Sequence, residues 1–431
     1  MQVKLWFSSI LLLSLVSTSL FGDVITIQGN AAVTTMMPPA NNATYWENII
    51  DRNEDNANGV LLNQHNHVSA YAATQASHMS KRGTDNNNPY EDVPPNNKGK
   101  TSLELAEAEL YFDSQVTNWA RVHVATQYAQ DFTNPSLYQY AQNAMFFPEA
   151  YAELNNFQQG DADWAFAKIG RQYVNFTSRQ SALISQPLTT WLGLTNVTAM
   201  TVGVANLGGF YSDAYVYNGN LYGTTVNERA NSANTIHSWG AEMGYAMNVS
   251  NNTQLNVFAD YIANLTDSLN FGYNTGDFGT QGIYPDKKLP GYALHVNYMM
   301  GPLAILADYV SMLSAFSPET ESYDGKGAKL SAYGFEADYL VDANHSQTIS
   351  LGYQGSAQAL QFNALQTVFT MPRSRILAGY QYAISSNVAL KFEYMFDKDY
   401  NKSDSVATLN QIVYGSSASN NTILARLNVT F

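Results

Sequence analysis

The chain ends with Ile423-Leu424-Ala425-Arg426-Leu427-Asn428-Val429-Thr430-Phe431. The odd-numbered residues from Ile423 to Phe431 are apolar, whereas the even-numbered ones include Arg426, Asn428 and Thr430. This period of two is the pattern of a strand with one apolar face and one wet face. Strands that separate lipid from a water-filled lumen show it. The stretch therefore predicts a transmembrane β-strand at the end of the chain.

The same alternation recurs upstream, with charges opposite aromatic residues. In 387–397, Phe392 and Tyr394 alternate with Lys391 and Glu393. A charge on the lipid face costs ~2–4 kcal/mol at the bilayer midplane, so the charged faces are expected to point into a lumen. Segments 329–340, 237–247 and 119–129 follow the same pattern.

These patterns predict an all-β fold, a transmembrane antiparallel β-barrel of about sixteen strands. Short polar connections alternate with long ones, as expected for tight periplasmic turns and long external loops. The predicted strands are 24–33, 101–113, 119–129, 145–155, 164–174, 198–205, 209–218, 237–247, 254–264, 289–299, 302–313, 329–340, 346–355, 371–382, 387–397 and 421–431.

Two stretches fit the pattern poorly. In 164–174, Trp164 and Phe166 share a parity with Lys168, which a β-bulge would explain. The Asn-rich stretch 34–100 has no clear period, and an external loop, a lumen plug and a periplasmic segment all stay open. A first strand near 66–75 in place of 24–33 would keep the strand count unchanged.

The first residues resemble an export signal, in which Lys4 precedes an apolar run from Leu5 to Leu20. The expected organisation is a signal peptide at 1–22, a first strand with the uncertain segment at 23–100, and the main barrel at 101–431.

The chain has 13% aromatic residues and no Cys, so packing and strand closure, not disulfides, must stabilise it.

The net charge of the chain and the absence of catalytic motifs argue against several classes of function. A formal net charge of −14, one unit more negative after loss of Lys4, argues against nucleic-acid binding and favours cations in a pore. The sequence has no Gly-x-Ser-x-Gly elbow and no Gly-rich phosphate loop. We therefore expect that the protein is not an enzyme and that it has no catalytic residues and no cofactor. His65, His67 and His78 are interpreted as solvated loop residues and not as a metal site.

Segment 175–197 is the candidate pore constriction, because it is too apolar for a freely solvated loop. The alternative is packing on the outer rim or against another loop. The residues expected to line the constriction are Arg179, Gln186, Thr189, Thr190 and Trp191.

Charged residues on the polar faces are expected to line the lumen. They either pair with one another and stiffen the wall or create a selectivity field. Arg375, Lys391 and Arg426 lie on consecutive strands, where a basic patch for an anionic solute is one interpretation. Phe431 is the expected signal for the outer-membrane assembly machinery. The lumen candidates are Arg121, Arg171, Arg375, Lys391, Arg426, Glu107, Glu109, Glu336, Asp338 and Glu393.

Two stretches carry a family resemblance. KIGRQYVNFTSRQSALISQPLTTWLGLTNVTAMTVGV at 168–204 and ELAEAELYFDSQVTNWARVHVA at 104–125 resemble the LbtU-type siderophore porin family. The resemblance implies an outer-membrane barrel that takes up iron–siderophore complexes without a TonB-coupled plug. Asn175-Phe176-Thr177 replaces the family's Pro-Phe-Gly, and Leu194-Thr195 replaces its Glu-Thr, so no binding residue is carried over.

The leading functional hypothesis is uptake of a small solute, a ferric siderophore, through a pore in the bacterial outer membrane. A TonB-coupled receptor needs roughly 22 strands plus a plug, for which this chain has too few residues. The alternatives are a general or nutrient porin with cation preference and a structural or adhesive surface barrel. The expected environment is a lipid bilayer, and a homotrimer is one arrangement that the sequence leaves open.

Overall fold

The computed structural model of the protein describes the barrel wall and parts of its connections. The described residues are 60–63, 66–79, 100–117, 119–129, 145–155, 163–174, 176–177, 181–206, 208–219, 235–250, 253–268, 287–342, 346–360, 371–385, 387–408 and 412–430.

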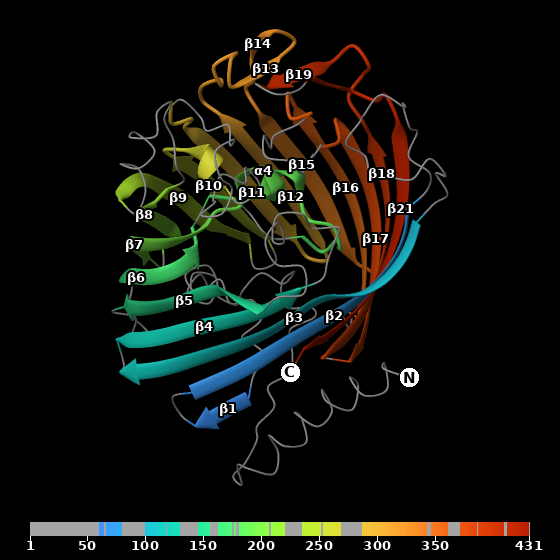
Figure 1. Ribbon diagram of the computed structural model, residues 1–431. Coiled ribbons are helices and arrows are strands. Elements are labelled where there is room, and N and C mark those ends of the chain that lie inside the picture. Colours follow the sequence, from blue (N-terminus) through green and yellow to red (C-terminus); the bar gives the residue numbers. More distant parts are fainter. Residues whose placement is uncertain are drawn as a thin grey trace.

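Sixteen antiparallel strands form one closed barrel, which confirms the predicted fold (Figure 1). The last strand pairs with the first, from Tyr71↔Thr430 to Met79↔Thr422, so the sheet has no free edge. A short strand, β1 (Val60–Asn63), pairs with the start of β2. The barrel strands are β2 (Asn66–Met79), β3 (Lys100–Thr117), β4 (Ala120–Ala129), β5 (Met145–Asn155), β6 (Asp163–Tyr173), β7 (Asn196–Asn206), β8 (Phe210–Asn218), β9 (Ile236–Ser250), β10 (Thr253–Ile262), β11 (Gly291–Met300), β12 (Leu303–Met312), β15 (Ser331–Leu340), β16 (Gln347–Ala357), β17 (Ser374–Ser385), β18 (Val388–Lys398) and β21 (Ser419–Thr430).

The predicted strands from 101–113 to 421–431 each correspond to one barrel strand, with ends shifted by a few residues. The first strand differs. β2 lies between β3 and β21, the position that the sequence assigned to 24–33 or to a strand near 66–75. Residues 24–33 lie outside the described part of the chain, and the boundaries at 22 and 100 stay predictions. His67 and His78 are on β2 and not in a loop.

The two faces of the wall differ in chemistry, as the alternation predicts. Outward residues such as Trp239 and Leu351 are exposed although they are apolar. Inward residues of the same strands, including Glu242 and Ser350, are buried inside the barrel. Of the helices that the structure describes, none is long and apolar enough to cross a membrane.

The two ends of the barrel carry connections of different length. At one end, called the short-turn end, successive strands join within a few residues, as at Gly301-Pro302 between β11 and β12. At the other, the long-loop end, the connections include 174–195, 313–330 and 399–418. The chain enters β2 and leaves β21 at the short-turn end, because the number of strands is even.

The expectation of a β-bulge in 164–174 is wrong, because the described residues of β6 pair with β5 and β7 without a shift in register. Phe166 and Lys168 both point inward and are buried, with the ammonium 5.9 Å from the ring centroid. Gly203, directly opposite Phe166 on β7, leaves room for the ring, since a Cβ there would lie 2.4 Å from Phe166 Cζ. Gly203 thus accommodates the inward Phe166 without a bulge.

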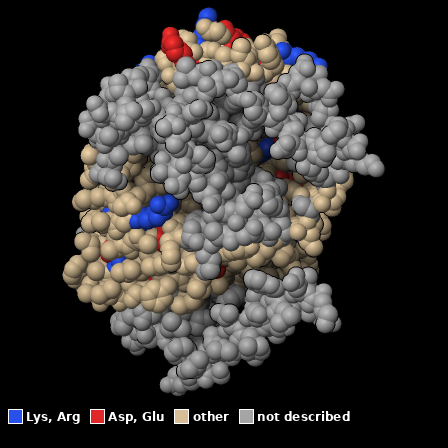
Figure 2. Space-filling view, viewed as in Figure 1, with Lys and Arg blue, Asp and Glu red and all other residues tan. Residues whose placement is uncertain are grey.

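A small sheet covers part of the long-loop end. We call it the cap sheet, and it consists of β13 (Glu321–Tyr323), β14 (Lys326–Gly327), β19 (Ser405–Thr408) and β20 (Ile412–Tyr414). It joins two connections that are far apart in the sequence, and Tyr323 packs edge-on against Tyr400 with ring centroids 6.3 Å apart. Figure 2 shows charged side chains gathered at the top of the view, over this end of the molecule.

Glu321 places a carboxyl group inside the cap sheet, where it is 2% exposed. Burial raises the pKa of Glu321 from 4.5 to about 8, because the charged form loses its hydration there. The folded cap sheet holds the proton more tightly than an opened one. Its stability is therefore highest below about pH 4.5 and declines as the pH rises through about 8.

The variant Glu321→Gln should remove this pH dependence, since the amide does not ionise. At alkaline pH the cap sheet of the variant should be cleaved more slowly by a protease than that of the unaltered chain, whereas at about pH 5 the two should be alike. Limited proteolysis of both proteins side by side at each pH measures this. Equal cleavage at alkaline pH would contradict the buried, protonated state of Glu321.

Candidate constriction inside the barrel

The connection 174–195 between β6 and β7 folds into the barrel, and we call it the inward loop. Its two ends meet at the wall, where Val174 N donates to Thr195 O at 3.1 Å. It contains the short helix α4 (Leu188–Gly193), which touches β12, β15 and β16 on the far side of the lumen. Figure 1 shows α4 inside the ring of strands.

Local sequence explains the helix. Pro187 precedes it, with a backbone conformation outside the helical region that suits a helix start. Trp191 N donates to Pro187 O at 3.1 Å, and Leu194 N donates to Thr190 O at 2.9 Å. Gly193 lies against the first part of the loop, because a Cβ there would be 2.3 Å from Thr177 Cγ2. The helix and residues 176–177 thus pack together as one unit.

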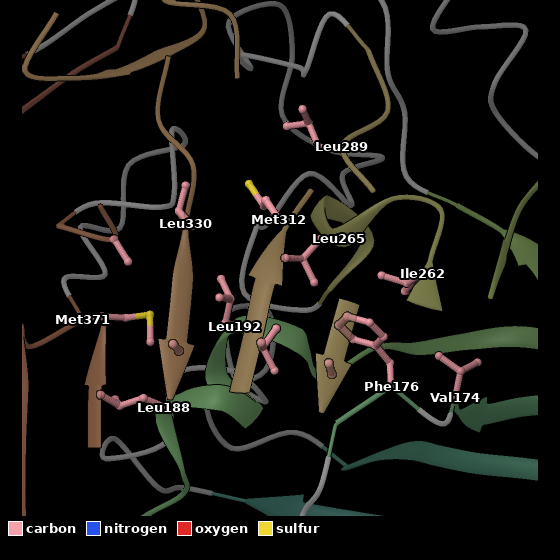
Figure 3. Packing of buried hydrophobic residues seen from close by; sticks show 14 of the residues in the cluster. Val174, Phe176, Leu188, Leu192, Ile262, Leu265, Leu289, Met312, Leu330 and Met371 are labelled. Atoms are coloured by element: carbon pink, nitrogen blue, oxygen red, sulfur yellow. The ribbon is translucent and has the colours of Figure 1, made fainter. Parts of the chain in front are cut away.

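Apolar side chains hold this unit, the root of the loop, against the wall. Phe176, Leu188 and Leu192 are fully buried and belong to one hydrophobic cluster with residues of the long-loop end. Figure 3 shows Leu188 and Leu192 among Met312, Leu330 and Met371. Fully burying such a side chain contributes ~1.5–3 kcal/mol, so the root is firmly attached.

The part of the loop between residues 176–177 and α4 includes Ser181–Gln186, which we call the tip. Carboxyl groups of the wall hold it in place. Ala182 N donates to Glu336 Oε1 and Ser181 Oγ to Glu336 Oε2, both at 2.7 Å. Ile184 N and Ser185 N both donate to Glu393 Oε2, at 2.5 and 3.1 Å. These four hydrogen bonds join the tip to β15 and β18, so the two carboxyl groups anchor it.

An apolar contact adds to this anchor. Leu183 packs with Leu377 and Met395 on β17 and β18. Two inward glycines leave space for it, because a Cβ on Gly379 would lie 2.7 Å from Leu183 Cδ2 and one on Gly352 would lie 3.1 Å from Cδ1. The tip therefore fits a notch in the wall as well as forming polar bonds.

The predicted constriction residues divide into two groups. Thr189 and Thr190 are buried residues of α4 itself, so they contribute to packing and not to the surface of a passage. Gln186 and Trp191 keep part of their surface exposed. Arg179 lies outside the described residues. Among the described residues of the loop, those with exposed surface are mostly in the tip, at Ser181, Ala182, Ser185 and Gln186.

Several predicted lumen charges lie on the inner wall and pair there. Arg121 forms an ion pair with Glu153 at 3.0 Å, and Glu153 is also 3.8 Å from Lys168 Nζ. Glu109 is half-buried and lies opposite Gln127 on β4. Glu336, Asp338 and Glu393 are buried on β15 and β18. The side chain of Glu107 and all of Phe431 are outside the described part.

The three basic residues on β17, β18 and β21 do not form one patch, so that interpretation is wrong. Arg375 pairs with Asp397 through Nε–Oδ1 and Nη2–Oδ2 distances of 2.7 and 3.0 Å, and its guanidinium lies 5.2 Å from the Trp191 ring. Lys391 lies opposite Arg426, six positions along β18 from Asp397. Lys391 Nζ donates to Ala182 O, and Arg426 donates to Gln75 Oε1.

The inward placement of Arg171 is also wrong. It is exposed and lies opposite Ala150 and Thr198, which are exposed on the outer face. Lys168 points into the barrel, so every second residue of β6 does the same. Arg171 comes three residues later and therefore points outward. It lies near the long-loop end of the strand, where a long side chain can reach water.

His295 is a feature that the sequence reasoning did not single out. Its Nε2 is 2.6 Å from Asp260 Oδ2 and its Nδ1 is 2.8 Å from Asp308 Oδ1, on the neighbouring strands. The same Nε2 lies 3.4 Å from Phe176 O in the root of the loop. The period of two in 254–264, 289–299 and 302–313 puts Asp260, His295 and Asp308 on the inward faces, and this parity is the sequence signal that could have found them. Within the described ranges no group of three residues has the arrangement of a metal site.

The glycine notch can be tested directly. Gly379→Ala forces a methyl group against Leu183 and should destabilise the protein by about 1–3 kcal/mol, as overpacking does. Gly334→Ala is the matched control, because the Cβ of this inward glycine on β15 would meet nothing nearer than 3.7 Å. The midpoint of thermal unfolding, followed by the change in gel mobility on heating, measures both. Equal midpoints would contradict the notch.

Comparisons with known proteins give distant relatives of the chain. No protein-family model matches the chain. A UPF0422 protein of Coxiella burnetii is 22% identical over 304 residues, 70% of this chain and 60% of that protein. A UPF0422 protein of Legionella pneumophila (strain Lens) is 23% identical over 364 residues, 80% of this chain and 64% of that protein. The chain thus spans less than two thirds of the length of these curated relatives.

Solved structures of porins share the fold. An anion-selective porin from Comamonas acidovorans has a TM-score of 0.52 at 12% identity, covering 85% of this chain and 99% of that one. Pseudomonas putida OprB has a TM-score of 0.50 at 8% identity, covering 85% and 94%. Salmonella typhi OmpF in complex with daunomycin has a TM-score of 0.50 at 13% identity, covering 85% and 98%. The likeness is one of fold.

Proposed function

We propose that this chain is an outer-membrane channel for small solutes, narrowed by the inward loop. The observation that carries the proposal is the course of this loop, which leaves the wall between β6 and β7 and bonds to Glu336 and Glu393 on β15 and β18. A sixteen-stranded barrel is wide enough to leave an aqueous lumen. A loop that crosses this lumen limits the size of the solutes that pass.

The charge of the lumen supports a preference for cations. The tip itself carries no charged residue. On the wall of β3–β6, the inward carboxylates Glu109, Asp113, Glu149 and Glu153 outnumber the cations Arg121 and Lys168. A lumen lined with more negative than positive charge raises the local concentration of cations.

The finer proposal is a ferric siderophore as the solute. It rests on the resemblance of 168–204 to the LbtU-type family, a stretch that includes the whole inward loop. Uptake without TonB coupling is part of this proposal, because the barrel has sixteen strands and not roughly 22. Recognition of Phe431 by the assembly machinery and association into a homotrimer remain expectations of the same kind.

Conductance across a planar bilayer tests the channel. The refolded chain should give a steady conductance with cations carrying more current than anions. Replacing the tip, 181–186, by two glycines should raise the conductance, because the root stays attached while the narrowing segment is lost. Unchanged conductance in a variant that still folds would rule out the constriction, and no conductance in either protein would favour a structural or adhesive barrel.

A panel of ferric siderophores, added to the same bilayers, tests the solute. Block at low concentration by a chelate, but not by the iron-free siderophore, supports the siderophore proposal. An open conductance that no chelate alters would leave a general porin with cation preference.

A further inference from the structure

The inward loop divides the inside of the barrel into two sides. It leaves the wall between β6 and β7, and its tip bonds to Glu336 on β15 and to Glu393 on β18. Because the sheet is closed, this course leaves β7–β12 on one side and β21 with β2–β5 on the other. We call the first the packed side and the second the accessible side, because their inward residues differ in exposure.

Most inward residues of the packed side are buried, from one end of the wall to the other. Near the long-loop end, Tyr217 and Val310 are 1% and 0% exposed and belong to the same apolar cluster as the root of the loop. Near the short-turn end, Tyr211 is 0% exposed. Its ring lies between those of Phe166 and Phe258, at centroid distances of 6.2 and 6.4 Å. The described wall on this side thus offers little surface to a solute.

The carboxyl groups of the packed side are buried as well. Asp213, Glu242 and Asp260 lie opposite one another on β8, β9 and β10. They are 3%, 6% and 4% exposed. At physiological salt the attraction of an ion falls off over about 8 Å, so groups behind the loop act less than groups that an ion can approach.

The accessible side keeps exposed inward residues along the height of the wall. On β21, Asn420 near the long-loop end, Arg426 in the middle, and Asn428 and Thr430 near the short-turn end are all partly exposed. Other inward residues of this strand are buried, among them Leu424. Water therefore reaches β21 at both ends and in the middle.

The exposed inward charges on β3–β5 are mostly negative. The side chains of Asp113 and Glu149 are each 13% exposed and that of Arg121 is 22% exposed, and Glu109 is also partly exposed. His123, which is 0% exposed, lies behind two of these carboxylates. Its Nδ1 is 2.8 Å from Asp113 Oδ1 and its Nε2 is 4.0 Å from Glu149 Oε2. Three carboxylates and one cation thus face the accessible side from these strands.

We propose that water and solutes pass on the accessible side only, along β21 and β2–β5, and that Glu109, Asp113 and Glu149 set the charge preference of this route. The inference rests on the proposed channel function and deepens it, since it names the route and the residues that select the solute. The tip borders the route at β18, where Lys391 Nζ donates to Ala182 O. The carboxyl groups of the packed side then contribute little, although they belong to the same inner wall.

The first test measures access and does not depend on conduction. The chain has no Cys, so Asn428→Cys and Asn256→Cys each place a single thiol near the short-turn end, on β21 and on β10. Asn428 is partly exposed, whereas Asn256 is 0% exposed. A positively charged methanethiosulfonate should modify the Asn428→Cys variant roughly tenfold faster or more, because a buried thiol reacts only through local opening. Mass spectrometry of the folded proteins measures the rates, and after unfolding both variants should react alike.

The second test compares the loss of two carboxylates from either side. Asp113→Asn with Glu149→Gln should lower the permeability ratio of cations to anions roughly twofold or more, because the charges that an ion approaches are removed. Asp213→Asn with Glu242→Gln removes the same two charges from the packed side and should leave the ratio nearly unchanged. The reversal potential across a planar bilayer in a KCl gradient measures both. Gel mobility before and after heating checks folding, and Glu149→Gln against Glu242→Gln gives the same comparison if a double variant does not fold.

The outcomes separate the route from the channel function. Faster modification of the Asn428→Cys variant in a protein that does not conduct would support one-sided access, and the channel function would fail alone. Equal rates of modification in a protein that conducts would overturn the route and leave the channel function intact. An equal or larger change in the permeability ratio for the packed-side pair would overturn it too.

Discussion

The closure of the sheet between β2 and β21 is the constraint on which the rest of the structure depends. A bilayer offers no water to the backbone, so every N–H and C=O group of a membrane-spanning sheet needs a partner within it. The register of Asn66–Met79 against the last strand meets this need. Arg426 and Gln75 form a side-chain bond across the same seam, between residues 351 positions apart in the sequence.

Closure at sixteen strands creates a second requirement. A ring of this size leaves a lumen that inward side chains alone do not fill. The inward loop occupies part of it, and its root joins the connections of the long-loop end in one apolar cluster through Leu265, Leu289 and Phe316. The loop is thus attached at three places: at its ends in the wall, at the apolar cluster, and at the carboxylates of β15 and β18.

The inner face combines stability with function in the same residues. Glu336 and Glu393 are buried carboxylates, which are costly unless hydrogen-bonded. The tip supplies those bonds, so the wall and the loop satisfy each other. The ion pairs of Arg121 with Glu153 and of Arg375 with Asp397 do the same within the wall. The polar lining is therefore organised by pairing within the wall and between the wall and the loop.

The sequence by itself determined the strands, their inward and outward faces, the alternation of short and long connections, and the position of a loop too apolar for solvent. These features are local, since a period of two over ten residues reports which faces meet lipid and water. The incorrect predictions from the sequence also have local causes. An inward Phe166 disturbed the parity of β6 and misplaced Arg171, and a weakly patterned stretch hid β2.

Only the tertiary structure decided which strands hold the loop. The partners of Ala182 and Ile184 lie 154 and 209 residues away, and no local pattern relates them. The same is true of the notch that Gly379 and Gly352 leave for Leu183, and of the separation of Arg375 from Lys391 along β18. Such contacts depend on closure and on strand register, which bring distant segments together across the lumen. The sequence predicted Glu336 and Glu393 as lumen charges, but only the closed barrel shows that they anchor the inward loop.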